Sequence, residues 1–203
     1  MHLSFQGKEL ILKALVQSRA IFLATVNGMP KSVEQRMLKL YQKLLWGEDK
    51  AGLMTWGKAI NKKDIGGLNV PDIRSRLEAI ELTWIKRWLA PKEERPAWAY
   101  VLDSILFANV RPSPKLDRQT KISWIFQTWH EAKGPQAKIS PQVQYMLEVA
   151  RKYNITVQAP KFSLETKERM PIWLHPLGIT NNNYIVNKKA AKCLRIDHDV
   201  RTI

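Results

Sequence analysis

The stretch that decides the fold is IGGLNVPDIRSRLEAIELTWIKRWL, residues 65–89. Its two adjacent glycines, Gly66-Gly67, indicate either a backbone with a positive φ or a close approach of another part of the chain. Leu68 and Val70 alternate with their neighbours as in a short strand. Pro71-Asp72 then opens a predicted helix that continues to the end of the stretch.

One apolar stripe runs along this predicted helix. At about 100° per residue, the side chains of the stripe lie within roughly a 90° arc. We expect these side chains to form core: Ile73, Leu77, Ile80, Trp84 and Trp88. The two tryptophans are therefore expected to pack inside the protein rather than to stack on bases.

Further apolar segments lie on both sides of this helix. Their periodicity and their proline or Asn-Gly boundaries predict helices at about 5–26, 30–46, 97–109, 117–131, 141–153 and 188–195. Ser4 is the predicted N-cap of the first of these helices, and Ser140, followed by Pro141, is the predicted N-cap of the helix at 141–153. The first helix has so little polar surface that we expect most of it to be buried. The chain is predicted to be mostly α, with a helical bundle and short extended segments over 1–110 and a less regular, basic helical region over 111–203.

The charge of the chain is its most unusual feature. The 203 residues include 33 Lys and Arg but only 18 Asp and Glu, which gives a net charge of +15 at neutral pH. Such a charge favours polyanionic partners, with nucleic acid first and an anionic membrane second. The apolar runs are too short for a transmembrane helix, and we expect no membrane partner. The single cysteine, Cys193, and the lack of a secretory pattern predict an intracellular protein, with nucleus and cytoplasm not distinguished.

No catalytic motif is visible in the chain. Phosphate-binding loops of the GxxxxGK[ST] and GxGxxG types are absent, as is the GxSxG nucleophile turn. Cys193 and His198 form the only close Cys/His pair, which is too few ligands for a zinc site. No carboxylates converge as two-metal chemistry requires. We therefore expect no enzymatic activity, no metal and no cofactor.

The helix at 30–46 presents the clearest binding surface. Four cations occupy roughly a 140° arc: Lys31, Arg36, Lys39 and Lys43. Opposite them lies an apolar stripe formed by Val33, Met37, Leu40, Tyr41, Leu44 and Leu45, with Glu34 at the edge of the basic face. Two interpretations stay open, a solvated helix face and a row of phosphate contacts, and the second would be independent of base sequence.

Other residues are weaker candidates for nucleic-acid binding. The N-terminal candidates are Lys8 and Lys13, and the C-terminal ones are Lys188, Lys189, Lys192, Arg195 and Arg201. Trp46 lies off the apolar stripe and next to Gly47, so it could stack on a base, although packing is the more common role.

Three sequence segments carry a family resemblance. They are LSFQGK at 3–8 before an apolar helix, PK at 30–31 before a helix that ends in LLWG at 44–47, and GGLNVPDI at 66–73 before a helix with tryptophans. In this order and spacing they resemble the segment after the palm in reverse transcriptases of non-LTR (LINE-type) retrotransposons. Residues 163–175 and 193–202 are similar to the linker before the ribonuclease H domain in fungal members.

The resemblance implies a helical thumb and a connection region. In this family the thumb closes on the template–primer duplex, so the implied partners are RNA or an RNA–DNA duplex, together with the palm and ribonuclease H domains. The family's catalytic Asp-Asp motif has no counterpart here, which implies a non-catalytic fragment of a polyprotein. The alternatives are an inactive retroelement remnant and an unrelated helical interaction protein.

Overall fold

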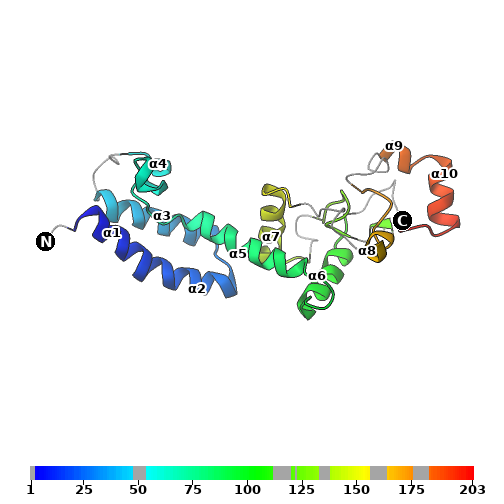
Figure 1. Ribbon diagram of the computed structural model, residues 1–203, viewed down its shortest axis with the longest axis horizontal. Coiled ribbons are helices and arrows are strands. Elements are labelled where there is room, and N and C mark those ends of the chain that lie inside the picture. Colours follow the sequence, from blue (N-terminus) through cyan, green and yellow to red (C-terminus); the bar gives the residue numbers. More distant parts are fainter. Residues whose placement is uncertain are drawn as a thin grey trace. The chain divides into compact units, whose positions relative to one another are not determined.

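A computed structural model describes residues 3–47, 54–111, 120–121, 123–132, 138–155, 164–175 and 183–203. These residues are mostly helical (Figure 1), which confirms the predicted fold class. Within these ranges the only β pairing consists of two isolated antiparallel bridges, Val110 with Glu131 and Pro171 with Thr202.

The chain divides into two compact units, Met1–Ile85 and Lys86–Ile203. The boundary lies inside the long helix α5 (Ile73–Trp88), which contributes to both units. The domains expected from the sequence, 1–110 and 111–203, stay a prediction.

The first unit begins with one long helical run. It consists of α1 (Phe5–Ile11), the π-helical segment η1 (Leu12–Gln17) and α2 (Ser18–Asn27). The hydroxyl of Ser4 accepts a hydrogen bond from the backbone N–H of Gly7 at 3.2 Å, so the predicted N-cap is confirmed. The run ends at Gly28, whose φ of 70° is a conformation that favours glycine.

The expectation that most of this first helix is buried is wrong. The inward face holds Glu9, Leu12, Gln17 and Ala24, while several large apolar side chains point to solvent. The exposed ones are Leu10, Leu15, Phe22, Leu23 and Val26. A helix that is apolar all round can bury only the face that meets the rest of its unit, and composition does not reveal which face that is.

Helix α3 (Lys31–Trp46) follows Pro30, as predicted. Its buried face is centred on Tyr41, Leu45 and Glu34, whereas Val33 and Leu40 of the predicted stripe are exposed. The aromatic side chain of Trp56, the first residue of α4 (Trp56–Ile60), explains this rotation, because it packs against Tyr41 with ring centroids 6.5 Å apart. Packing against α4 therefore determines which residues of the predicted apolar stripe of α3 become buried.

The Gly66-Gly67 turn needs glycine for both of the predicted reasons. Gly66 has a φ of 80°, directly after the 3-10 turn η2 (Lys63–Ile65). A Cβ on Gly67 would lie 2.0 Å from the carbonyl oxygen of Asn61. The predicted strand at 68–70 is wrong: Asn69 has a φ of 52°, and its N–H donates to that same carbonyl at 2.8 Å.

Helix α5 begins as predicted after Pro71-Asp72. The carboxylate of Asp72 accepts from the N–H groups of Arg74 and Ser75, which caps the helix. Of the predicted core stripe, Ile73, Leu77 and Trp88 are buried, whereas Ile80 and Trp84 are half-buried. The inward face also includes Ile85, which the predicted stripe did not contain.

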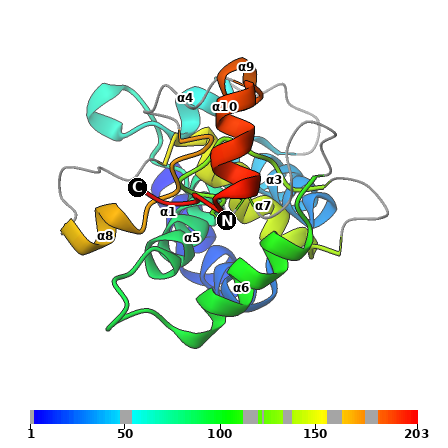
Figure 2. The same ribbon diagram turned by 90° about the vertical axis from the view of Figure 1, so that its right-hand side faces the viewer.

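The second unit contains the remaining helices. They are α6 (Ala97–Ala108), α7 (Pro141–Lys152), α8 (Leu164–Glu168), α9 (Asn183–Val186), α10 (Lys189–Lys192) and the π-helical η6 (Cys193–Asp197). The Oγ of Ser140 accepts from the N–H of Val143, so the predicted cap of α7 is confirmed. Helix α10 continues directly into η6 near the C-terminus, as Figure 2 shows.

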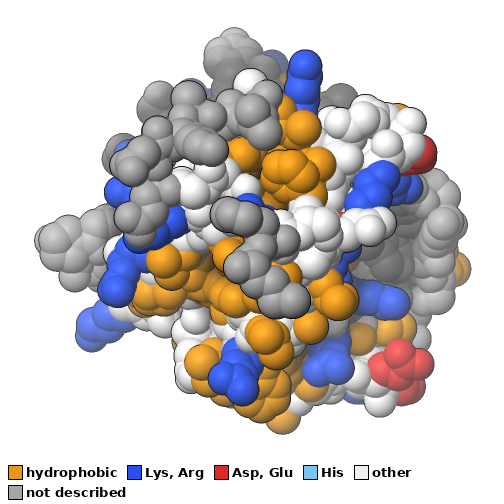
Figure 3. All heavy atoms as spheres, turned by 90° about the vertical axis from the view of Figure 1, so that its left-hand side faces the viewer, with side chains coloured by type: hydrophobic (Ala, Val, Ile, Leu, Met, Phe, Trp, Pro, Cys, Tyr) orange, Lys and Arg blue, Asp and Glu red, His pale blue; other side chains and the backbone are white. Residues whose placement is uncertain are grey.

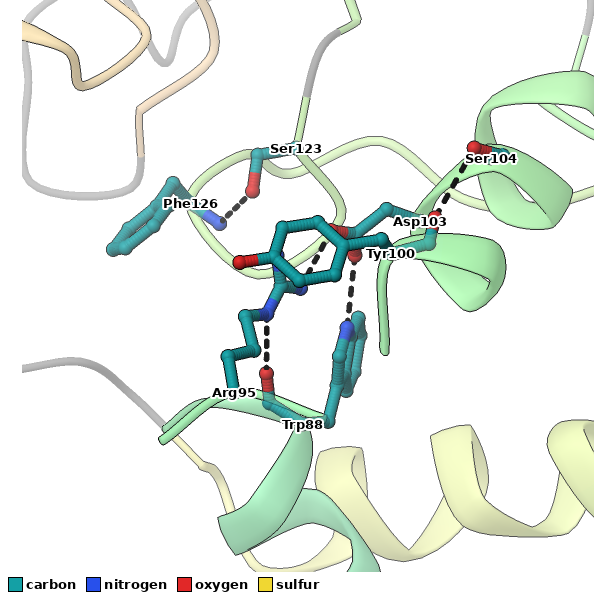
Figure 4. A network of polar contacts seen from close by, with 7 residues as sticks. All are labelled: Trp88, Arg95, Tyr100, Asp103, Ser104, Ser123 and Phe126. Atoms are coloured by element: carbon teal, nitrogen blue, oxygen red, sulfur yellow. Dashed lines mark hydrogen bonds and ion pairs between the residues drawn. The ribbon is translucent and has the colours of Figure 1, made fainter. Parts of the chain in front are cut away.

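A polar network joins the end of α5 to α6 (Figure 4). The carboxylate of Asp103 accepts from the indole N–H of Trp88 at 2.8 Å and from the guanidinium of Arg95. The Nε of Arg95 also donates to the carbonyl oxygen of Trp88, and its guanidinium lies 4.5 Å from the ring centroid of Tyr100. Arg95 therefore binds both the last residue of α5, Trp88, and Asp103 of α6.

The predicted helix at 117–131 is wrong wherever this segment is described, at 120–121 and 123–131. These residues form turns and an irregular segment, with the buried Gln127 at their centre. The Gln127 side-chain amide donates to the carbonyl oxygens of Thr120 and Trp173, both at 2.8 Å. Its oxygen accepts from the N–H of Ser123 and the indole of Trp129. Side-chain hydrogen bonds thus replace those of a helix.

We predict that Gly67→Ala destabilises the protein by at least about 2 kcal/mol, because the new methyl group overlaps backbone that cannot rotate away. The matched control is Gly57→Ala in α4, where a Cβ meets nothing within 4 Å. The control is expected to be neutral or to stabilise by up to about 1 kcal/mol. Urea denaturation measures both. Equal stability of the two variants would contradict the close approach at Gly67.

Candidate nucleic-acid interface

The four cations of α3 are all on the surface. Lys31, Arg36, Lys39 and Lys43 are exposed. Because α3 is a regular helix over 16 residues, the four side chains share one side of it, within roughly a 140° arc. The predicted basic face is therefore present as a continuous exposed surface on one helix.

The one carboxylate of α3 is turned away from this face. Glu34 is buried, and its Oε1 accepts from Nε of Arg74 at 3.0 Å and lies 2.9 Å from Nη2 of the same guanidinium. The hydrogen bonds from Arg74 to Glu34 raise the pKa of that guanidinium further above its ordinary value. The sequence pattern predicts Glu34 at the edge of the basic face. The rotation of α3 towards Trp56 puts it inside instead.

A second carboxylate, Glu9, is also internal. Its Oε1 lies 2.6 Å from Nζ of Lys13 and accepts from Nδ2 of Asn69 at 3.1 Å, while its Oε2 lies 2.6 Å from Nζ of Lys63. Burial raises the pKa of Glu9, but the hydrogen bonds and positive charges of the two lysines outweigh that effect and hold the pKa below its usual value.

The inward carboxylates leave a basic surface on the first unit. Among its described acidic residues, Glu9, Glu34, Glu78 and Glu81 are buried, Asp72 is half-buried and Asp64 is exposed. Most of the cations of this unit have their charge at the surface. Figure 3 shows lysine and arginine side chains scattered among hydrophobic ones on the face that it displays.

The N-terminal candidates have structural contacts. Nζ of Lys8 donates to the carbonyl oxygen of Leu45 at 2.9 Å and lies 5.6 Å from the ring centroid of Phe5. Lys13 pairs with Glu9. Lys8 therefore joins α1 to α3, whereas the pair of Lys13 lies within the first helical run, and neither lysine belongs to the exposed face of α3.

The C-terminal candidates separate into two kinds. Lys188, Lys189 and Lys192 are exposed around α10. Arg195 is only 2% exposed; its Nη1 donates to the carbonyl oxygen of Val186 at 2.8 Å, and its guanidinium lies 5.9 Å from the ring centroid of Trp173. Nε of Arg201 donates to Asp199 at 2.6 Å. The geometry places Arg195 in the core of the second unit, where a phosphate cannot reach it.

Trp46 packs against another aromatic residue. Its ring lies edge-on to that of Trp56, with centroids 6.1 Å apart. Burial raises the pKa of the neighbouring Tyr41 to about 12. The Tyr41 hydroxyl and the Trp46 indole N–H are buried and have no hydrogen-bond partner among the described residues. The sequence pattern does not indicate this aromatic cluster, because Trp56 lies outside every predicted helix.

Described residues offer little chemistry beyond this surface. They contain no group of three or more His, Cys, Asp and Glu side chains that could hold a metal ion. Cys193 is exposed, and its hydrogen bond to Asp197 raises the pKa of the thiol, which keeps it in the less reactive protonated form. None of the described helices combines the length and the hydropathy that crossing a bilayer requires.

Comparisons with known proteins do not add a relative. No family model, no curated protein and no solved structure matches this chain.

We predict that Glu9 makes the protein lose stability in acid. Because the pKa of Glu9 is lower in the folded state than in the unfolded state, its contribution is fully present above the unfolded pKa of about 4.3 and is lost as the pH falls through the folded value. Urea denaturation of wild type and Glu9→Gln over this range measures the effect. Glu9→Gln is expected to lower stability near neutral pH and to flatten the loss below about pH 4.5.

The control for this experiment is Asp64→Asn, which removes an exposed carboxylate next to Lys63. This variant is expected to follow the wild-type pH dependence. A Glu9→Gln curve that runs parallel to wild type through the acid range would show that the ion pairs of Glu9 do not contribute to stability.

Proposed function

We propose that this protein binds duplex nucleic acid, RNA or an RNA–DNA hybrid, without sequence preference through the basic face of α3. The observation that carries the proposal is the orientation of α3: its four cations are exposed, while Glu34 is buried and pairs with the exposed Arg74 of α5. Because Glu34 is buried, the exposed side of α3 carries positive charges without a carboxylate of the same helix. Such a surface attracts a polyanion more strongly than a surface of mixed charge does.

The shape of the basic face suits a phosphate backbone. Its four cations extend along α3 from the first to the last turn, and a helix rises by about 1.5 Å per residue. Exposed lysine and arginine side chains can each neutralise a phosphate and release counterions. Contacts of this kind position a protein on a duplex without reading bases.

The sequence resemblance supports the same function. Segments of the first unit resemble the thumb of non-LTR (LINE-type) reverse transcriptases, in which a helical thumb closes on template–primer duplex. We propose that the chain is a non-catalytic fragment of this kind, an intracellular thumb and connection region that works beside palm and ribonuclease H domains. The competing proposal of an inactive remnant predicts no duplex binding at all.

We predict a steep salt dependence of duplex binding. If each of the four cations releases about 0.7–0.9 of a counterion, together they contribute a slope near −3 to the plot of log affinity against log salt. Changing Lys31, Arg36, Lys39 and Lys43 to Gln should weaken binding and flatten the slope by about that amount, with no change in base preference. Fluorescence anisotropy with a labelled RNA–DNA hybrid measures both quantities.

The matched control removes the same charge elsewhere in the first unit. Arg19, Lys58, Lys62 and Arg76 are exposed and lie off the basic face of α3. The control with these four changed to Gln should keep most of the slope. Equal flattening in the two variants would mean that net charge alone drives binding, and an unchanged slope in the α3 variant would exclude the α3 face.

A further inference from the structure

We propose that a face of the first helical run docks an acidic amphipathic helix of a partner protein. This face, here called the outer face of α2, consists of Arg19, Phe22, Leu23 and Val26 of α2 together with Leu15 of η1. The proposal goes beyond duplex binding, because it involves a different helix and none of the four cations of α3.

The outer face of α2 is a narrow apolar strip. The four members in α2 lie within roughly a 100° arc that includes Arg19, and Leu15 lies one turn before Arg19 in η1. Leu15 is 60% exposed, Phe22 72%, Leu23 59% and Val26 74%. Large apolar side chains that are gathered in this way on one face mark an interaction site.

The inward side of the same helical run strengthens this conclusion. The buried residues there include Gln17 and Glu9, both polar. This helical run therefore buries polar side chains on its inward side and exposes large apolar side chains on its outward side. This reversed pattern is not needed for the folding of the unit, so a partner gives the better explanation for the exposed strip.

A helix is the occupant that fits the width of the strip. Side chains at i, i+4, i+7 and i+11 form a ridge one helix wide, and such ridges pack into the grooves of a second helix. Described residues around the strip form no wall that would enclose a small molecule, because the neighbouring positions Ser18 and Thr25 are also exposed.

Arg19 specifies the charge of the occupant. It lies at the centre of the strip, it is exposed, and no carboxylate among the described residues pairs with it. A partner that covers Phe22 and Leu23 also removes the guanidinium of Arg19 from water. Burying that charge is unfavourable unless the partner places a carboxylate opposite it. The partner helix must therefore be acidic at its centre.

Arg19 also disfavours the other occupants. In a two-fold pairing of copies centred on the strip, Arg19 would face Arg19 of the second copy, and each chain has a net charge of +15. In a membrane the strip would carry a charge into the hydrocarbon with apolar side chains on both sides of it. A nucleic-acid backbone would satisfy the guanidinium but leave the apolar side chains in water.

The test uses the full chain and a pair of synthetic helical peptides. The first peptide has leucines along one face with glutamates at the centre and flanks of that face, and its twin carries lysines in place of the glutamates. Fluorescence anisotropy should detect binding of the acidic peptide only. Arg19→Glu should weaken that binding by at least about tenfold and create binding of the lysine peptide.

Phe22→Ser should also weaken binding of the acidic peptide by at least about tenfold, since it removes the most prominent aromatic contact of the strip. The matched control is Ile65→Ser, which changes a side chain of similar exposure, 69%, outside the strip. All three variants alter exposed residues, and circular dichroism verifies that each remains folded.

Several outcomes would overturn the proposal. They are no binding of the acidic peptide, the same affinity for wild type and Arg19→Glu, and the same affinity for Phe22→Ser and Ile65→Ser. A doubled mass in light scattering that Phe22→Ser abolishes would assign the strip to a second copy. Binding to phosphatidylserine vesicles that Phe22→Ser abolishes would assign it to a membrane. Duplex binding by α3 is measured separately, so its loss would not affect this result.

Discussion

The buried carboxylate of Glu9 is the interaction on which the first unit depends. It joins α1 to Lys63 and Asn69, two residues that follow in sequence only after α3 and α4. Those two partners reach Glu9 because the chain between them turns at Gly66-Gly67 and passes close to Asn61. Removing the turn would leave a buried carboxylate without two of its partners, which is costly, whereas removing the carboxylate would break the contacts that join α1 to Lys63 and Asn69.

The same internal pairing determines the character of the surface. Glu9 and Glu34 are themselves buried and pair with cations that are exposed or half-buried, so their negative charge is withdrawn from the surface. The exposed cations of α3 are then not balanced by carboxylates of their own helix. A neighbouring helix, α2, presents apolar side chains instead. The two surfaces have different chemistry, so a polyanion and an acidic helix can each recognise one of them.

Sequence patterns predicted the helices well wherever caps and periodicity agreed. Ser4, Ser140-Pro141 and Pro71-Asp72 each start a helix where expected. The errors have a common cause, which is tertiary packing. The side of α3 that becomes buried depends on Trp56, and the irregular segment around Gln127 depends on an acceptor as distant in sequence as Trp173. For the same reason the sequence indicated the cations of α3 but not the inward position of Glu34 or the burial of Arg195.

The most direct test of the central claim is lysine footprinting of the full chain with and without an RNA–DNA hybrid. An amine-acylating reagent modifies accessible lysines, and mass spectrometry reports the rate at each position. If the carboxylates are internal and α3 presents its cations to a duplex, then Lys31, Lys39 and Lys43 should be protected several-fold. Lys58 and Lys62, which are exposed in the same unit, should stay reactive. Uniform protection of all exposed lysines, or protection limited to Lys188, Lys189 and Lys192, would contradict the account.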